Sequence, residues 1–291
     1  MKQDVDAPER PAELDDALRG WIVQQVQAGV APGEVVAPLV ARGWSEQGAI
    51  DTVEAVVRDY LADHAQANAL PPSVRVPAPV ESNGSSIIDV DGRPVRVHMH
   101  LRHPQVVVFG NVLDDAECDA LIALARTRVR RCEVVDADTG ADVVHEARTS
   151  EGLAFSRGQT ALCERIERRI AALLQWPYDH GEGLQILRYG PGAQYRPHHD
   201  YFDPERPGNA HILKRGGQRV ASLVMYLNTP TRGGATSFPE AGLEVAAVKG
   251  HAVFFSYDRP HPMTRTLHAG EPVHEGEKWI ATKWLREGVH H

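Results

Sequence analysis

Residues 219–228 read RVASLVMYLN, a run in which almost every side chain is apolar or small. Similar short runs lie on either side of it: GLQILRY at 183–189, HAVFFSY at 251–257 and KWIATKWL at 278–285. They are rich in β-branched and aromatic residues, and glycine or proline separates them. Many short strands divided by turns are typical of a β-sandwich or jelly roll, and not of alternating βαβ units. We therefore expect a β-sandwich or jelly roll after about Trp176.

A strand and two helices are expected just before this β region. The strand is the buried pattern VVVFGNVL at 106–113, and a helix follows it with Asp114 or Asp115 as its N-cap. A second helix, from about Thr160 to Leu174, carries its apolar residues on one face. The sequence thus predicts an α+β domain whose helices flank the strands.

The first part of the chain has a different character. Apolar residues recur at helical spacing from Leu14 to about His64, which predicts three helices. Proline, serine, asparagine and glycine then become frequent, as in a linker or an arm that follows the surface. We expect a three-helix domain at 1–66, a linker at 67–97 and a main domain at 98–291. The helices are either a packing element or a module that binds a protein partner.

Charge and hydropathy argue against two kinds of partner. The formal net charge of −8 provides no basic field that would attract nucleic acid. The sequence shows neither an apolar run long enough to span a membrane nor the basic start and apolar stretch of a secretory signal. We therefore expect a cytoplasmic protein that acts without nucleic acid or membrane.

A candidate metal site lies in the segment YRPHHDYF at 195–202. In a strand, residues i and i+2 point to the same face, so His198 and Asp200 can contact one ion. The best third ligand is His268, on a late strand of the same β region. Two imidazoles and one carboxylate leave open positions on an octahedral ion, which suits Fe(II) better than catalytic zinc. A solvated His-x-Asp pair is the alternative.

Lys278 follows His268 by ten residues, in the sequence GEKW. A cation at this place could bind the distal carboxylate of a dicarboxylic cosubstrate. A charge-assisted hydrogen bond of that kind contributes roughly 1.5 to 3 kcal/mol, enough to favour a diacid over a monoacid. The alternative is a solvated lysine.

Six motifs in one order carry a family resemblance: YRPHHDYF at 195–202, GGQRVA at 216–221, MYLN at 225–228, GGATSFP at 233–239, LHAG at 267–270 and GEKWIATKW at 276–284. This succession, from about Gln105 to Glu287, resembles the catalytic domain of the prolyl 4-hydroxylase family of 2-oxoglutarate- and Fe(II)-dependent dioxygenases. The resemblance implies a double-stranded β-helix (jelly roll) core with flanking helices. It also implies a need for Fe(II), 2-oxoglutarate, O2 and ascorbate.

The resemblance also implies roles for particular residues around the metal. The iron ligands would be His198, Asp200 and His268, and Lys278 would anchor 2-oxoglutarate. Residues at positions that help to hold the cosubstrate are Tyr189 and Thr236. Tyr226 lies on a central strand near the same pocket, where a packed core tyrosine is the alternative.

Three further residues match positions that border the substrate: Tyr195, Arg219 and Trp284. Their alternatives are a packed tyrosine, an ion-paired arginine at a strand end and a core tryptophan. The chain departs from the family at Glu271, where a cysteine is frequent. We expect this change to affect local packing and not chemistry.

The implied reaction is hydroxylation of an unactivated C–H bond, in the first place of a peptidyl proline, with release of succinate and CO2. A small molecule or a free amino acid is the alternative substrate. Two other functions remain open at this point: a non-catalytic jelly roll that binds a partner, and a zinc-dependent hydrolase.

Overall fold

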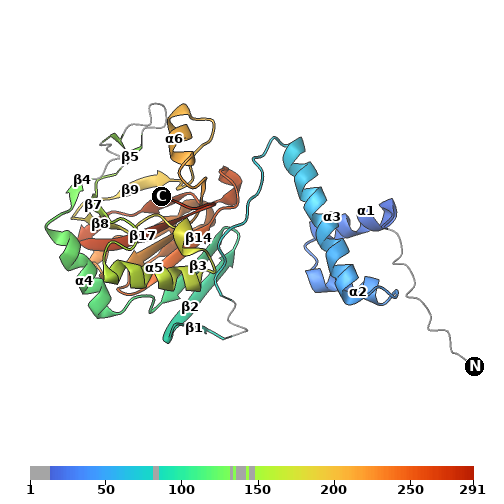
Figure 1. Ribbon diagram of the computed structural model, residues 1–291, viewed down its shortest axis with the longest axis horizontal. Helices are drawn as coiled ribbons and strands as arrows, with labels where there is room; N and C mark the ends of the chain where they lie inside the picture. Colours follow the sequence, from blue (N-terminus) through green and yellow to red (C-terminus); the bar gives the residue numbers. More distant parts are fainter. Residues whose placement is uncertain (1–13, 81–84, 132–133, 136–141, 144–147) are drawn as a thin grey trace, which may run out of the picture. The chain divides into compact units, whose positions relative to one another are not determined.

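The computed structural model describes residues 14–80, 85–131, 134–135, 142–143 and 148–291 (Figure 1). The chain divides into two compact units, Met1–Pro72 and Ser73–His291. Each unit has a hydrophobic core of its own. Residues 1–13 of the predicted three-helix domain lie outside the described residues.

The described part of the N-terminal unit contains three helices: α1 (Asp16–Gln27), α2 (Pro32–Val40) and α3 (Glu46–Ala67). Asp15 and Ser45 cap α1 and α3 by accepting hydrogen bonds from main-chain N–H groups of the first turn. Ile22, Leu39 and Val56 are fully or almost fully buried between the helices. The apolar spacing of the sequence therefore reflects a real core.

The larger unit is built on a nine-stranded antiparallel sheet. In spatial order its strands are β1 (Ile87–Val90), β2 (Arg93–Arg102), β3 (Gln105–Gly110), β14 (Ala252–Ser256), β10 (Arg219–Tyr226), β17 (Lys278–Arg286), β8 (Gln185–Tyr189), β7 (Glu151–Ala154) and β4 (Arg130–Arg131). The central strands β10 and β17 are buried along nearly their whole length. Burial on both faces explains why these strands lack polar alternation in the sequence.

A four-stranded antiparallel sheet covers one face of the large sheet. Its strands in spatial order are β13 (Leu243–Val245), β12 (Thr236–Phe238), β15 (His268–Gly270) and β9 (Tyr195–His198). Val224 and Phe255 of the large sheet belong to one core with Phe238 and Val245 of the small sheet. The remaining strands of the described residues form two antiparallel pairs: β11 (Arg232–Gly233) with β16 (Val273–Glu275), and β5 (Val134–Val135) with β6 (Asp142–Val143).

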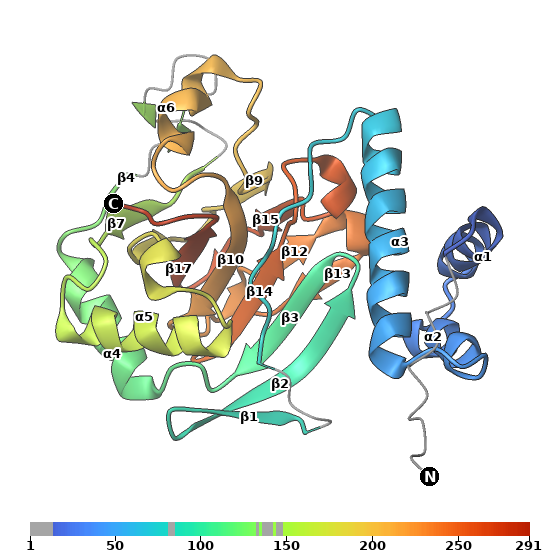
Figure 2. The same ribbon diagram turned by 45° about the vertical axis from the view of Figure 1, so that its right-hand side comes forward.

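Helices α4 (Asp115–Arg126) and α5 (Ala161–Leu173) pack together on one side of the large sheet (Figure 2). Both predicted helices are confirmed, and Asp114 is the N-cap of α4, in a capping box with Glu117. The short helices are η1 (Tyr178–His180), η2 (Pro207–Asn209), α6 (Ala210–Leu213), η3 (Pro239–Ala241) and η4 (Pro262–Thr264). None of the helices in the described ranges combines the length and apolar character that a membrane span needs. The unit is thus a mixture of helices and antiparallel sheets, as predicted.

The segment predicted as a linker, 67–97, has a different structure in its second half. Asp91 and Gly92 both have positive φ, 53° and 80°, and turn β1 back onto β2 as a hairpin. Val90 and Val95 are buried beneath it. An Asp-Gly pair between apolar residues favours this tight turn, because both positions tolerate the left-handed conformation. The large sheet therefore begins well before Gln105.

Candidate active site

Three side chains far apart in the sequence meet on the small sheet. His198, the last residue of β9, stands opposite His268, the first residue of β15. Asp200 follows two residues after His198, beyond the end of the strand and not within it as expected. One ligand atom from each of the three lies within 4.8 Å of the others. The structure therefore brings together the three residues predicted to bind a metal.

The hydrogen bonds of the two imidazoles leave one nitrogen of each facing Asp200. Nδ1 of His198 lies 2.9 Å from the carbonyl oxygen of Arg196, and Nδ1 of His268 lies 3.0 Å from that of Thr266. Because a carbonyl oxygen only accepts, each Nδ1 carries a hydrogen, and Nε2 is the nitrogen of each ring that is left for a metal ion. Both Nε2 atoms lie 3.6 Å from an Asp200 carboxylate oxygen. This set of two imidazoles and one carboxylate fits Fe(II).

The protonation states also suit a metal. Burial raises the pKa of Asp200, but the neighbouring His268 and His198 outweigh it and lower the pKa, so Asp200 is a carboxylate. Burial lowers the pKa of His268 to about 4, His198 adds to this shift and Asp200 opposes it. At neutral pH neither group has to lose a proton before it binds an ion.

Two residues behind Asp200 were missed by sequence reasoning. Ser222 on β10 donates a hydrogen bond from Oγ to Oδ2 of Asp200 at 2.5 Å. Its Oγ also lies 3.0 Å from the hydroxyl of Tyr257. Both side chains are buried, so water does not compete for these bonds. The pair fixes the aspartate to the large sheet.

Lys278 begins β17 and is only 2% exposed. Burial lowers the pKa of its ammonium to about 8, and the charge of Glu271 opposes this shift. Its Nζ lies 5.4 Å and 5.7 Å from the ring centroids of Tyr189 and Tyr226. Within the described part of the chain, no oxygen accepts a hydrogen bond from this Nζ. Burying a cation without a hydrogen-bond acceptor costs free energy. A bound anion at this position would therefore stabilise the ammonium.

A narrow inner cavity connects Lys278 with the three candidate metal ligands. Tyr189 and Thr236, two of the residues predicted to hold the cosubstrate, line this cavity. Tyr226 is not part of the lining; its hydroxyl donates to Oγ1 of Thr236 at 2.9 Å. Burial raises the pKa of Tyr226, so the phenol remains a hydrogen-bond donor. Tyr226 thus orients Thr236 from behind the cavity wall.

An outer groove of about 850 Å³ reaches the same centre from the other side. Tyr195, Arg219 and Trp284, the three predicted substrate residues, all line it. The Tyr195 ring stacks on that of His198, with centroids 3.5 Å apart. Tyr195, Asp200 and Trp284 line both cavities, so the groove ends at the candidate metal ligands.

Arg219 is both ion-paired and part of the groove. Its guanidinium carbon lies 3.9 Å from the ring centroid of Trp284, and its Nε and Nη2 donate to Glu182 at 2.7 and 3.0 Å. Arg286 also donates to Glu182, at 2.7 Å. Burial raises the pKa of Glu182, but Arg219 and Arg286 lower it to about 2. Glu182, which no sequence motif indicated, therefore holds Arg219 against Trp284.

Glu271 does more than alter packing, which corrects our expectation. Its Oε1 accepts a hydrogen bond from Ser237 Oγ at 2.5 Å. Its negative charge also offsets part of the lowering of the Lys278 pKa that burial causes. The residue that departs from the family pattern therefore acts electrostatically on the candidate cosubstrate anchor.

Comparison with known proteins shows which family this chain resembles. Residues 184–286 match the family model of the 2OG-Fe(II) oxygenase superfamily. Prolyl 4-hydroxylase 1 of Arabidopsis thaliana is 40% identical over 202 residues, which cover 63% of this chain and 69% of the relative. Prolyl 4-hydroxylase 2 of the same plant is 36% identical over 229 residues, covering 70% and 73%. A crystal structure of a viral collagen prolyl hydroxylase from Paramecium bursaria Chlorella virus-1, as a 2OG complex, has a TM-score of 0.48 at 30% identity and covers 62% of this chain and 95% of that one.

The matched region and the site within it define a 2-oxoglutarate- and Fe(II)-dependent dioxygenase. Within that class, the family follows from the two plant prolyl 4-hydroxylases, because their sequence identity with this chain is high and the matches cover more than two thirds of their length. The chain belongs to the prolyl 4-hydroxylase family.

Proposed function

We propose that this dioxygenase hydroxylates C4 of a proline within a peptide chain, in a double-stranded β-helix formed by its two sheets. The single observation that carries the proposal is the buried ammonium of Lys278. It lacks a protein acceptor among the described residues and shares a cavity with the His198, Asp200 and His268 cluster. A metal site beside a place for a dianion is what a 2-oxoglutarate-dependent reaction requires.

His198, Asp200 and His268 would hold Fe(II), through two Nε2 atoms and one carboxylate. When bound, the ion supplies the site at which O2 is activated together with the oxidative decarboxylation of 2-oxoglutarate. One oxygen atom enters the substrate C–H bond and the other enters succinate, while CO2 leaves. The reaction therefore needs no further reductant for each completed turnover.

Lys278 would receive the distal carboxylate of 2-oxoglutarate. Thr236 and Tyr189 would line its path, with Thr236 oriented by Tyr226. The core around β10 and β17 keeps bulk water from this end of the cavity, which strengthens the ion pair. These residues bind and orient the cosubstrate but move no proton.

The size of the outer groove favours a peptide over a free amino acid. A groove of about 850 Å³ lies in the upper part of the range for small-molecule sites, so one proline would fill only a part of it. Tyr195, Arg219 and Trp284 would border the target residue. Among the described residues, Nε1 of Trp284 is a buried donor without an acceptor, and it would donate to a main-chain carbonyl of the peptide.

The remaining predictions belong to the same proposal. Ascorbate would restore enzyme that has turned over without hydroxylating its substrate, and O2 would be the cosubstrate. The three helices of the N-terminal unit would bind a protein partner, with a domain boundary near 66. Strands β1 and β2 assign residues 87–97 to the larger unit, so the boundary expected near 97 is not kept. The protein would act in the cytoplasm.

Mass spectrometry of a proline-containing peptide tests the proposal. The full chain, Fe(II), 2-oxoglutarate and O2 should add one oxygen atom to proline, and succinate should form in equal amount. The His198→Ala variant should lose both products. Hydroxylation of free amino acids alone would point to the small-molecule alternative. A zinc-dependent activity indifferent to 2-oxoglutarate would point to a hydrolase.

A further inference from the structure

The outer groove carries an excess of positive charge on a protein whose formal net charge is −8. Among the described residues, five arginines line it, at positions 148, 157, 206, 215 and 219, against three side-chain carboxylates. One of these carboxylates belongs to the metal cluster, and another, Glu182, is shared between Arg219 and Arg286. The described lining of the groove is therefore cationic although the whole chain is acidic.

Arg157 supplies a positive charge that no side-chain carboxylate pairs with among the residues that the structure describes. Its Nη1 donates to three main-chain carbonyl oxygens, those of Asp179, Gly181 and His290, at 3.1, 3.1 and 2.5 Å. Carbonyl oxygens fix the guanidinium but leave its charge in place. Within the described ranges, Nε and Nη2 of Arg157 donate to no protein acceptor, so two donors remain for a ligand.

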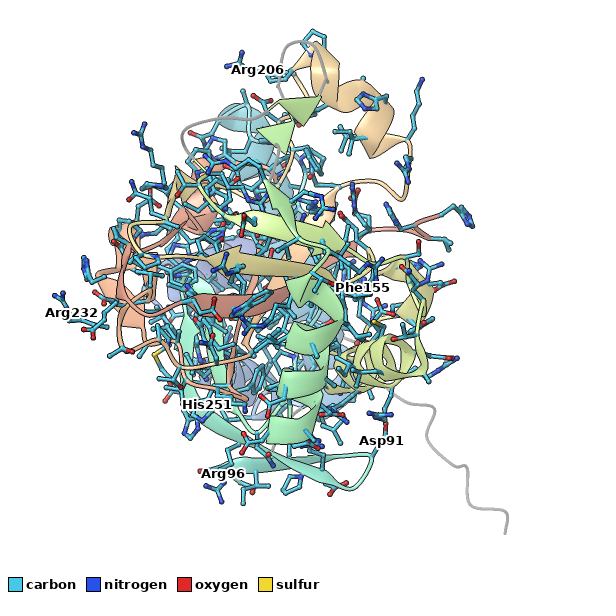
Figure 3. All side chains as sticks on the ribbon, turned by 90° about the vertical axis from the view of Figure 1, so that its left-hand side faces the viewer. Asp91, Arg96, Phe155, Arg206, Arg232 and His251 are labelled. Atoms are coloured by element: carbon cyan, nitrogen blue, oxygen red, sulfur yellow. The ribbon has the colours of Figure 1, made fainter. Side chains whose placement is uncertain are left out.

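The segment around η2 and α6 supplies two more cations. Arg206 and Arg215 are exposed at the groove. Arg215 donates to the main-chain oxygen of His291 at 3.2 Å, and Arg206 lies 3.7 Å from Asp203. Figure 3 shows Arg206 at the upper edge of the molecule, with Phe155, another lining residue, below it.

We propose that the groove selects peptides in which aspartate or glutamate flanks the target proline, and that Arg157 and Arg215 recognise these carboxylates. The inference rests on the proposed function and specifies its substrate class. Guanidinium groups bind carboxylates through two parallel hydrogen bonds, which gives direction as well as attraction. The arrangement also makes binding of an acidic peptide specific to the groove, because the negative charge elsewhere on the protein surface repels acidic chains.

Two peptides of equal length test the inference: one with aspartate and glutamate flanks, and one with asparagine and glutamine at the same positions. For the full-length wild type we expect kcat/KM to be roughly tenfold higher with the acidic peptide, because exposed ion pairs contribute a few-fold each. The preference should shrink as salt is raised. Peptide binding measured by fluorescence anisotropy should show the same ratio without turnover.

The variants separate recognition from folding. Arg157→Gln with Arg215→Gln should bring the ratio close to one. Arg215→Glu, at an exposed position, should favour a peptide with lysine flanks. The matched control is Arg96→Gln, an exposed arginine of β2 outside the groove, which should keep the wild-type ratio.

Equal turnover of both peptides by the wild type would overturn this inference and leave the proposed function standing. A preference that survives in both groove variants would overturn the assignment to Arg157 and Arg215. Failure to hydroxylate any proline peptide, with 2-oxoglutarate still consumed, would overturn the proposed function and the inference with it.

Discussion

The Oγ atom of Ser222 lies 2.5 Å from Oδ2 of Asp200, and this contact joins the small sheet to the large one at the candidate metal centre. Asp200 follows the end of β9, where a short loop alone would hold it loosely. The hydrogen bond fixes the carboxylate, and Tyr257 supports Ser222 from behind. Partners of this kind orient metal ligands and raise metal affinity.

Loss of the Ser222 hydroxyl should weaken metal binding. We expect Ser222→Ala to lower the affinity for Mn(II) or Co(II) roughly 10- to 100-fold, because Asp200 loses its fixed orientation. Calorimetric titration of the metal-free protein measures this. Ser256→Ala, at a buried serine of the adjacent strand β14, is the control, and Ser222→Thr should restore part of the affinity. Equal affinity of Ser222→Ala and wild type would disprove the role.

Replacement of Lys278 should separate function from stability. In Lys278→Met the KM for 2-oxoglutarate should rise roughly 10- to 150-fold, which corresponds to the loss of one charge-assisted hydrogen bond of about 1.5 to 3 kcal/mol. The free energy of unfolding without ligand should increase, because a buried ammonium lacking an acceptor is removed. Steady-state kinetics and urea unfolding test the two effects. An unchanged KM would exclude Lys278 as the anchor.

The pKa of Lys278 predicts how cosubstrate binding depends on pH. In the free protein this pKa is lowered to about 8 by burial. Below pH 8 the ammonium is charged and binds the carboxylate; above pH 8 it must first gain a proton. The KM for 2-oxoglutarate should therefore be constant up to about pH 7.5 and rise above 8, by up to about tenfold per pH unit. Lys278→Arg stays charged, and a similar rise in that variant would assign the titration to another group.

Glu271 should shift this pH dependence. Its charge opposes the lowering of the Lys278 pKa, so Glu271→Gln should lower that pKa further. The rise in the KM for 2-oxoglutarate should then begin at a lower pH than in the wild type. Glu244→Gln, a change on strand β13 at the edge of the small sheet, is the control. An unshifted profile would show that Glu271 acts only through its hydrogen bond to Ser237.

Much of the fold was predictable because buried helices and strands have recognisable patterns of apolar residues in the sequence. The helices α4 and α5 showed apolar spacing, α4 also showed an N-cap, and the central strands showed unbroken apolar runs. The β1–β2 hairpin was missed although Asp91-Gly92 is a strong turn signal. The composition of the segment before it, rich in proline and serine, outweighed that local signal in the prediction.

The site was predictable where a motif fixes residues in order, as for His198, Asp200, His268 and Lys278. No sequence motif indicated Ser222 or Glu182. Ser222 is one small residue on a strand buried on both faces, and Glu182 lies in a loop whose path only the folded chain defines. Contacts between distant segments depend on strand register, which a single sequence does not specify.

Hydroxylation under ¹⁸O-labelled O2 tests the central claim most directly. The account predicts one labelled atom in the proline residue of the peptide and one in succinate, with both products lost in His268→Ala and without 2-oxoglutarate. Oxygen derived from water in the hydroxyproline, or labelled product from His268→Ala, would contradict it.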